Sequence, residues 1–224
     1  MPKINLKTQA YNTIRQKIVT CEYAPGTFLN EELLTSELGL SRTPIRDALS
    51  RLEQEGLIEI KPKKGILVMP LSINTINMIF EVRQLYEPYI LLNYGTSLST
   101  QQLKKFYSIF SSSKTNISCF ENQNYFYELD TQFHNFIVNT CPNGYIRQNY
   151  NMIQTQAERF RYMTGNFSTE RLDNTFQEHL DIICACLKND WKEAAEKMTY
   201  HLEQSKKSTF QLIFNGLSSE DLTL

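Results

Sequence analysis

Thirty residues near the N-terminus constrain the fold more than any other part of the chain, because they combine helix signals, a tight turn and a basic hairpin. The stretch reads SELGLSRTPIRDALSRLEQEGLIEIKPKKG and spans residues 36–65. Asn30 and Ser41 are each placed to cap a helix, and Gly39 lies between the two helices, where glycine commonly ends one. The pattern predicts two helices joined by a short turn, followed by two short strands joined by the turn KPKKG.

This order of elements is typical of a winged helix-turn-helix, in which the second helix enters the major groove of DNA. Arginine can donate two hydrogen bonds to one guanine, and hydroxyl groups suit phosphate oxygens. The candidate DNA contacts are Ser41, Arg42, Thr43 and Arg46 on the helix, and Lys61, Lys63, Lys64 and Gly65 on the hairpin. In the alternative interpretation, the arginines form a solvated helix surface paired with nearby acidic residues.

Composition alone does not argue for nucleic acid. The 224 residues carry a net charge of −1, and residues 1–71 hold 10 Lys+Arg against 8 Asp+Glu. No apolar run approaches the length of a membrane span, and the first residues lack the apolar centre of a signal peptide. We therefore expect a cytoplasmic protein without membrane contact. The five cysteines are odd in number and lack zinc-finger spacing, which favours reduced thiols.

From Ser72 onward, apolar residues recur at helical spacing only. Helices are expected near residues 73–96, 100–113, 120–140, 143–165, 172–188 and 190–213. The predicted fold is therefore mainly α, with a winged helix-turn-helix over 1–71, including a two-stranded β wing, and an all-α helical bundle over 72–224. The boundary is expected near Pro70–Ser72.

The three histidines of the chain all lie in this helical half, beside apolar helix positions. Asp130 and His134 are four residues apart and therefore share a helix face. His179 and His201 flank apolar stripes on the last two helices. Imidazole nitrogen and carboxylate oxygen suit a divalent transition metal ion such as Zn, Ni, Mn or Fe. Alternatively, each histidine could be hydrogen-bonded separately in the core.

The first part of the chain resembles the winged helix-turn-helix of the GntR family of bacterial transcription regulators. The resemblance rests on PGTFLNEELLTSELGLSRTPIRDALSRLEQEGLIEIKPKKGILV. It implies that Arg42 and Arg46 contact bases and that Gly65 lies at the wing tip. Some members have a basic residue early in the preceding helix, whereas this chain has Glu31 and Glu32. That departure implies that this helix end stays away from phosphates and that one base contact is missing.

The second part resembles the FCD ligand-binding domain that follows many GntR-type wings. The resemblance rests on IFEVRQLYEPYI, LDTQFH and EHLDIICACLKNDWKEAAEKMTYHL. It implies that Asp130, His134, His179 and His201 bind a metal ion whose shell a small organic acid completes. Arg83, which matches the family's R-x3-E with Glu87, and Arg159 would bind the carboxylate of this effector. In the alternative, Arg83 and Glu87 form only an intrahelical salt bridge, and Arg159 lies on the surface.

Together these features predict a bacterial DNA-binding transcriptional regulator, not an enzyme. We expect a homodimer on a pseudo-palindromic DNA operator, controlled by a small carboxylate effector, with repression as its expected effect. Two alternatives remain open. In one, the metal ion is itself the signal. In the other, the metal site activates water in a metalloenzyme, although no further histidine and no obvious general base accompany it.

Overall fold

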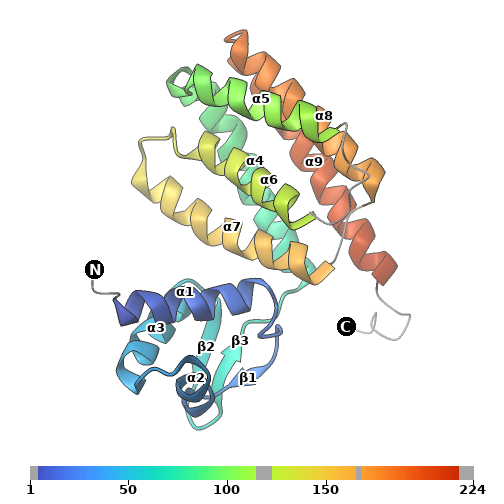
Figure 1. Cartoon of the computed structure of the whole chain (residues 1–224). Helices are drawn as coiled ribbons and strands as arrows, with labels where there is room; N and C mark the ends of the chain where they lie inside the picture. The colour runs from blue at the N-terminus through green and yellow to red at the C-terminus, as the bar shows by residue number, and fades with distance from the viewer. Residues whose placement is uncertain (1–4, 115–122, 165–167, 217–224) are drawn as a thin grey trace. The chain divides into compact units, whose positions relative to one another are not determined.

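The computed structural model describes residues 5–114, 123–164 and 168–216. The chain divides into two compact units. The first contains the residues up to Thr75 together with Thr155–Met163, and the second contains Ile76–Gln154 and the residues from Thr164 onward. The described strands all belong to the first unit, whereas the second is helical throughout its described part (Figure 1).

The first unit confirms the predicted helix-turn-helix and its hairpin. Its helices are α1 (Leu6–Val19), α2 (Glu31–Leu38) and α3 (Arg42–Gln54). The hairpin is formed by β2 (Ile58–Lys61) and β3 (Gly65–Val68). A third strand that the sequence did not reveal, β1 (Phe28–Leu29), pairs antiparallel with β3, so the sheet order is β1-β3-β2. A strand of only two residues, directly after a turn, shows no alternation from which it could be recognised.

Local sequence explains where α2 and α3 begin and end. The side chain of Asn30 accepts a hydrogen bond from the backbone N–H of Leu33 at 2.7 Å and so caps α2. Gly39 follows α2 with φ at 64°, the left-handed conformation that glycine adopts without strain. Ser41 precedes α3, but its side chain makes no capping hydrogen bond. Its exposed hydroxyl is therefore not used within the helix.

Gly65 has a structural reason to be glycine that is independent of any DNA contact. Its φ is 110°, and a Cβ at this position would lie 2.6 Å from the carbonyl oxygen of Leu29. Both the backbone conformation and the close approach of β1 exclude a side chain there. Lys63 also adopts a positive φ, of 64°, in the turn of the hairpin. The tip of the wing is thus a tight turn that presents Lys63 and Lys64 to solvent.

The second unit is a helical bundle. Its helices are α4 (Ile73–Tyr94, which begins in the first unit), the short η1 (Gly95–Ser97), α5 (Thr100–Lys114), α6 (Gln123–Val138), α7 (Gly144–Thr164, part of which belongs to the first unit), α8 (Thr169–Leu187) and α9 (Trp191–Gly216). The predicted helices are present, with ends that differ by a few residues. Helix α8 packs against α5 and α9. The apolar face predicted for α6 is buried in the core through Leu129, Phe133 and Ile137.

Two further findings concern the described residues only. No helix among them is long and apolar enough to cross a membrane. The four cysteines among them are free thiols, and Cys141 and Cys186 are buried in the bundle core. Cys119 lies outside the described residues.

Candidate metal centre and nucleic-acid interface

The candidate DNA-reading arginines lie exposed at the start of α3 and face acidic residues of α2. Arg46 donates from Nε to both carboxylate oxygens of Glu31, at 2.9 and 3.0 Å. A terminal nitrogen of Arg42 lies 3.8 Å from a carboxylate oxygen of Glu32. The bonds to Glu31 use Nε, so the two Nη groups of Arg46 are those that could reach a base edge. Glu31 thus orients the side chain that the sequence assigns to base reading.

Two other basic residues of this unit, Arg51 and Lys61, have different contacts from Arg46. Arg51, on the same helix, stacks its guanidinium over the ring of Tyr11, 3.8 Å from the ring centroid. Lys61 is paired with Glu59 within the hairpin, with 2.6 Å between Nζ and Oε1. Arg51 is therefore engaged by the protein itself, which makes it a suitable comparison for Arg46.

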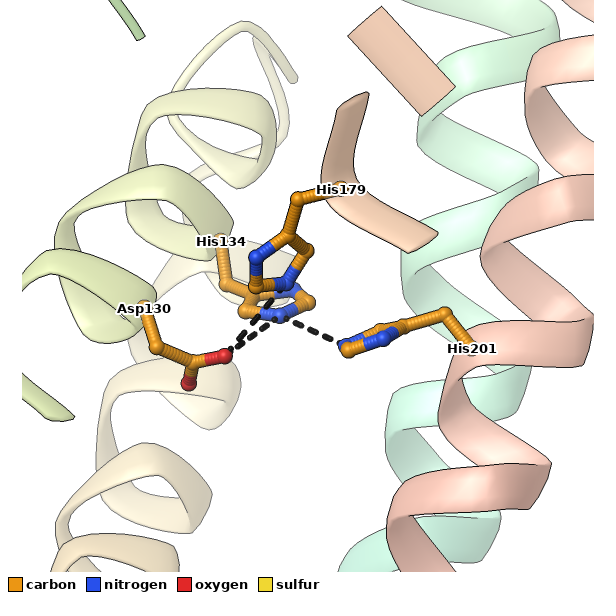
Figure 2. A group of neighbouring side chains, drawn as sticks. All are labelled: Asp130, His134, His179 and His201. Atoms are coloured by element: carbon orange, nitrogen blue, oxygen red, sulfur yellow. Dashed lines mark hydrogen bonds and ion pairs between the residues drawn. The ribbon is translucent and has the colours of Figure 1, made fainter. Parts of the chain in front are cut away.

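Helices α6, α8 and α9 bring Asp130, His134, His179 and His201 together, as Figure 2 shows. One ligand atom from each residue lies within 4.8 Å of the other three. Oδ1 of Asp130 lies 3.5 Å from Nε2 of His134 and 3.4 Å from Nε2 of His179. Atoms bound to one ion at about 2.1 Å lie roughly 3–4 Å apart, so this spacing suits a shared ion.

Two carboxylates orient two of the histidines. Nδ1 of His134 lies 2.5 Å from Oε2 of Glu87, and Nδ1 of His201 lies 2.7 Å from Oε2 of Glu178. In the neutral form of each ring, a proton on Nδ1 would be donated to that carboxylate and would leave Nε2 with a free lone pair. These two Nε2 atoms lie only 3.2 Å apart. Two facing lone pairs repel each other unless a proton or a metal ion lies between them.

His179 adds a third donor. Its ring is buried between Phe110 and Phe133, with centroids 4.8 and 4.9 Å away. Neither of its ring nitrogens has a hydrogen-bond partner among the described residues. A buried polar group without a partner is costly, and coordination of an ion would satisfy one of these nitrogens. Three imidazoles and one carboxylate form a donor set that fits a divalent transition metal.

The surroundings set the protonation of the cluster. Burial lowers the pKa of His179 well below its ordinary value, and neighbouring His201 lowers it further. Burial also lowers the pKa of His201. At His134 burial acts in the same direction, but the carboxylates of Glu87 and Asp130 together outweigh it and the pKa is raised. His179 and His201 are therefore neutral near pH 7, as metal ligands must be.

Glu87 is the centre of a buried network on α4 and α7. It accepts hydrogen bonds from Nε of Arg83 at 2.7 Å and from the hydroxyl of Tyr150 at 2.8 Å. Burial alone would raise the pKa of Glu87, but Arg83 and His134 outweigh it and the pKa is lowered. The Arg83–Glu87 pair is thus an intrahelical salt bridge, as one interpretation of the sequence held. Nη2 of Arg83 is nevertheless buried without a hydrogen-bond partner among the described residues.

Glu178 is held in a similar way. Arg171 donates two hydrogen bonds to its carboxylate, at 2.6 and 3.0 Å. These contacts, together with His201, lower the pKa of Glu178 although burial opposes this. Sequence reasoning did not single out Glu178 or Tyr150, because the former directly precedes His179 and the latter lies on another helix. Only the packing of α8 against α9 shows that Glu178 reaches His201.

The two candidate effector arginines belong to different units. Arg83 lies beside the cluster through Glu87, whereas Arg159 belongs to the first unit. Arg159 is buried and donates to the carbonyl of Met69 at 2.7 Å and to the side chain of Gln156 at 2.8 Å. Within the second unit, Arg83 is thus linked to the candidate ligands through Glu87 and His134.

Comparison with known proteins places the chain in a family. Residues 6–68 match the family described as bacterial regulatory proteins, gntR family, and residues 78–204 match the FCD domain. The chain belongs to the GntR family of DNA-binding transcriptional regulators and carries an FCD domain.

Two curated relatives and one solved structure illustrate the likeness. The HTH-type transcriptional repressor RspR of Escherichia coli K12 is 26% identical over 211 residues, which cover 94% of this chain and 92% of RspR. The gluconate operon transcriptional repressor of Bacillus subtilis is 28% identical over 168 residues, which cover 75% of this chain and 68% of the relative. The structure of McbR/YncC from E. coli shares the fold with a TM-score of 0.77 at 15% identity, over 94% of this chain and all of that one.

The structure predicts different costs for neutralising the two carboxylates that hold the histidines. Glu87→Gln leaves the charge of Arg83 buried without its counter-ion, which costs about 3–5 kcal/mol of unfolding free energy. Glu178→Gln, the matched control, affects an arginine whose side chain is 13% exposed and which also donates to Ser205. Its cost is expected to be smaller. Urea unfolding of the chelator-treated proteins measures both, and an equal loss would contradict the network described for Glu87.

Proposed function

We propose that the chain is a transcriptional repressor that binds a DNA operator as a homodimer and responds to a small carboxylate bound beside a metal ion. In this proposal residues 1–71 read the operator, and residues 72–224 bind the ion and the effector. The repressor assignment is supported by RspR and the gluconate operon repressor, both of which carry that name. The gluconate operon is named for a sugar acid, which is itself a small carboxylate.

Operator reading is assigned to the exposed start of α3 and to the wing. Arg46 would contact a guanine through its Nη groups while Glu31 holds Nε. Arg42 is the second candidate base reader, and Ser41 and Thr43 offer hydroxyls to phosphates. Lys63 and Lys64, with Gly65 at the turn, would follow the DNA backbone. A homodimer would present two such reading heads to two half-sites.

The metal ion is assigned to Asp130, His134, His179 and His201. The observation that carries this assignment is the 3.2 Å separation of two Nε2 atoms whose rings each point Nδ1 at a carboxylate. The ring nitrogens of His179, which make no hydrogen bond within the described part of the chain, support it. A divalent ion bound there would supply positive charge in a site from which water is largely excluded. Such a charge stabilises an anionic ligand next to it.

The effector is assigned to the same region through Arg83. Its Nη2 is buried and has no hydrogen-bond partner in the parts of the chain that the structure describes, although Nε is held by Glu87. A carboxylate can accept a hydrogen bond from such a group and gain from its charge. Arg159, the other arginine that the sequence suggested, donates to Met69 and Gln156, and its Nε has no hydrogen-bond partner among the described residues, so its part in effector binding stays a prediction.

Substitution of the reading arginine tests the DNA assignment. Arg46→Ala is expected to weaken binding to the specific operator by about 1–3 kcal/mol and to relax discrimination at one base pair. Lys63→Ala is expected to weaken binding to all sequences and to reduce the slope of affinity against salt by about 1. Fluorescence anisotropy on the upstream region of the chain's own gene measures both effects. Arg51→Ala is the control, and an equal loss of operator discrimination in Arg51→Ala would contradict the assignment to the start of α3.

Metal analysis tests the second site. Purified protein is expected to hold about one divalent ion per chain, and His134→Ala and His179→Ala are expected to lose most of it, because each removes one of four ligands. Asp130→Asn is expected to weaken retention as well. Asp173→Asn, on α8 outside the cluster, is the matched control. Full metal content in both histidine variants would show that the cluster is not the site.

The sequence left two alternatives open, a metal sensor and a metalloenzyme. They predict different results for the metal-loaded and the chelated protein. If the ion itself is the signal, loading and chelation alone switch operator affinity, and no organic acid has a further effect. If the chain is a metalloenzyme, the loaded protein converts a small acid while its operator affinity stays constant. The relatives compared above are transcriptional regulators, which supports the regulator.

A further inference from the structure

Glu32 is an acidic side chain on the surface that the proposed function assigns to DNA. It lies in the first turn of α2, and 85% of its side chain is exposed. A terminal nitrogen of Arg42 lies 3.8 Å from its carboxylate, which exceeds the length of a hydrogen bond. Acidic residues in the first turn stabilise a helix. That effect accounts for a carboxylate at this end of α2, but not for its place beside a candidate base reader.

The neighbouring acidic residue, Glu31, has a different contact. Both of its carboxylate oxygens accept hydrogen bonds from Nε of Arg46, and its side chain is only 32% exposed. Glu31 is therefore engaged in holding Arg46. Arg42 and Glu32 are 63% and 85% exposed and are not hydrogen-bonded to each other. They present a donor and an acceptor side by side, and both remain available to a third group.

The edge of a G·C base pair in the major groove carries the matching groups. Guanine presents the acceptors N7 and O6, and cytosine presents the N4 amino group, which is a donor. O6 and N4 are hydrogen-bonded to each other within the pair, so they lie about 3 Å apart. An arginine that donates to O6 therefore brings a carboxylate at its side within reach of N4. The separation of 3.8 Å between Arg42 and Glu32 fits this arrangement.

We propose that Glu32 is a base reader that accepts a hydrogen bond from the N4 amino group of the cytosine whose guanine partner Arg42 contacts. Two side chains then read one base pair across both DNA strands. The inference rests on the proposed function, because it takes the start of α3 to lie in the major groove. It replaces the expectation, drawn from Glu31 and Glu32, that this helix end makes one base contact fewer.

The combination of Arg42 and Glu32 selects G·C against A·T. An A·T pair presents an acceptor, a donor and an acceptor in that order. Arg42 then meets the amino group of adenine, and Glu32 meets the O4 oxygen of thymine, so that like groups face each other in both strands. Repulsion against the wrong partner is a common source of specificity. Because the phosphates beside the groove also repel a carboxylate, Glu32 adds selectivity at one base pair rather than overall affinity.

Binding of the full chain to variants of one operator half-site tests the inference. Arg42→Ala first identifies the base pair, as the position where replacing G·C by A·T weakens binding less than in the wild type. At that position Glu32→Ala is expected to lose about tenfold of the wild-type preference for G·C, with no change at other positions. Glu32→Gln keeps an acceptor oxygen and is expected to retain most of the preference. Both variants remove the same charge, so only the base contact distinguishes them.

A modified base isolates the same contact without a variant protein. N4-methylcytosine at this position keeps the base pair but replaces the amino hydrogen that faces the major groove. It is expected to weaken the binding of the wild type about tenfold, because Glu32 loses its donor. The binding of Glu32→Ala is expected to be unchanged by the methyl group. Fluorescence anisotropy at one salt concentration measures all of these affinities.

Glu170→Ala is the matched control, because Glu170 is also an exposed acidic residue in the first turn of a helix, α8. It should bind every operator variant like the wild type. Circular dichroism establishes that each variant is folded.

Three results overturn the inference: a Glu32→Ala variant with the full preference for G·C, equal losses in Glu32→Ala and Glu32→Gln, or an Arg42→Ala variant that relaxes no position. Equal losses would show that the charge of Glu32 acts without a base contact. Each of these results leaves the chain an operator-binding protein. A wild type that binds no operator contradicts the proposed function, and this inference with it.

Discussion

The contact between the carboxylate of Glu87 and Nδ1 of His134 determines the arrangement of the candidate metal centre. It points Nε2 of His134 at the other ligands, and it places a negative charge where Arg83 and Tyr150 also converge. The same contact ties α4 to α6, and the bond from Tyr150 adds α7. If an ion and an effector bind as proposed, a change in either would act on three helices at once.

The two faces of α4 differ in their surroundings. The inner face contributes Arg83 and Glu87 to the site, and the outer face carries the exposed apolar side chains of Met78, Leu85, Tyr89 and Leu92. A two-fold operator is sensitive to the spacing of two recognition helices, which one turn of DNA fixes at about 34–36 Å. If two copies bind the operator as proposed, a ligand that changes their spacing would change the operator affinity.

Features that depend on residues close together in the sequence could be predicted. Features that depend on packing between distant segments could not. Asn30, Gly39 and the turn at Lys63 define the helix-turn-helix and hairpin locally, and both are present. The four residues of the cluster were found because Asp130 and His134 share a face and the other histidines flank apolar stripes. Glu178 and the strand β1 were missed, since their partners lie elsewhere in the chain. The exposed apolar face of α4 was missed because apolar spacing does not tell a buried face from an uncovered one.

The most direct test is to measure the operator affinity of the wild type in the metal-loaded form, with and without a small carboxylate. The same measurement is repeated after chelation and again after reloading. If the cluster and Arg83 control the reading heads, the carboxylate changes the operator affinity of the loaded protein at least about tenfold, which corresponds to about 1.4 kcal/mol of coupling. Chelation removes this response, and reloading restores it. Equal operator affinity in all states, across a panel of small carboxylates, would contradict the account.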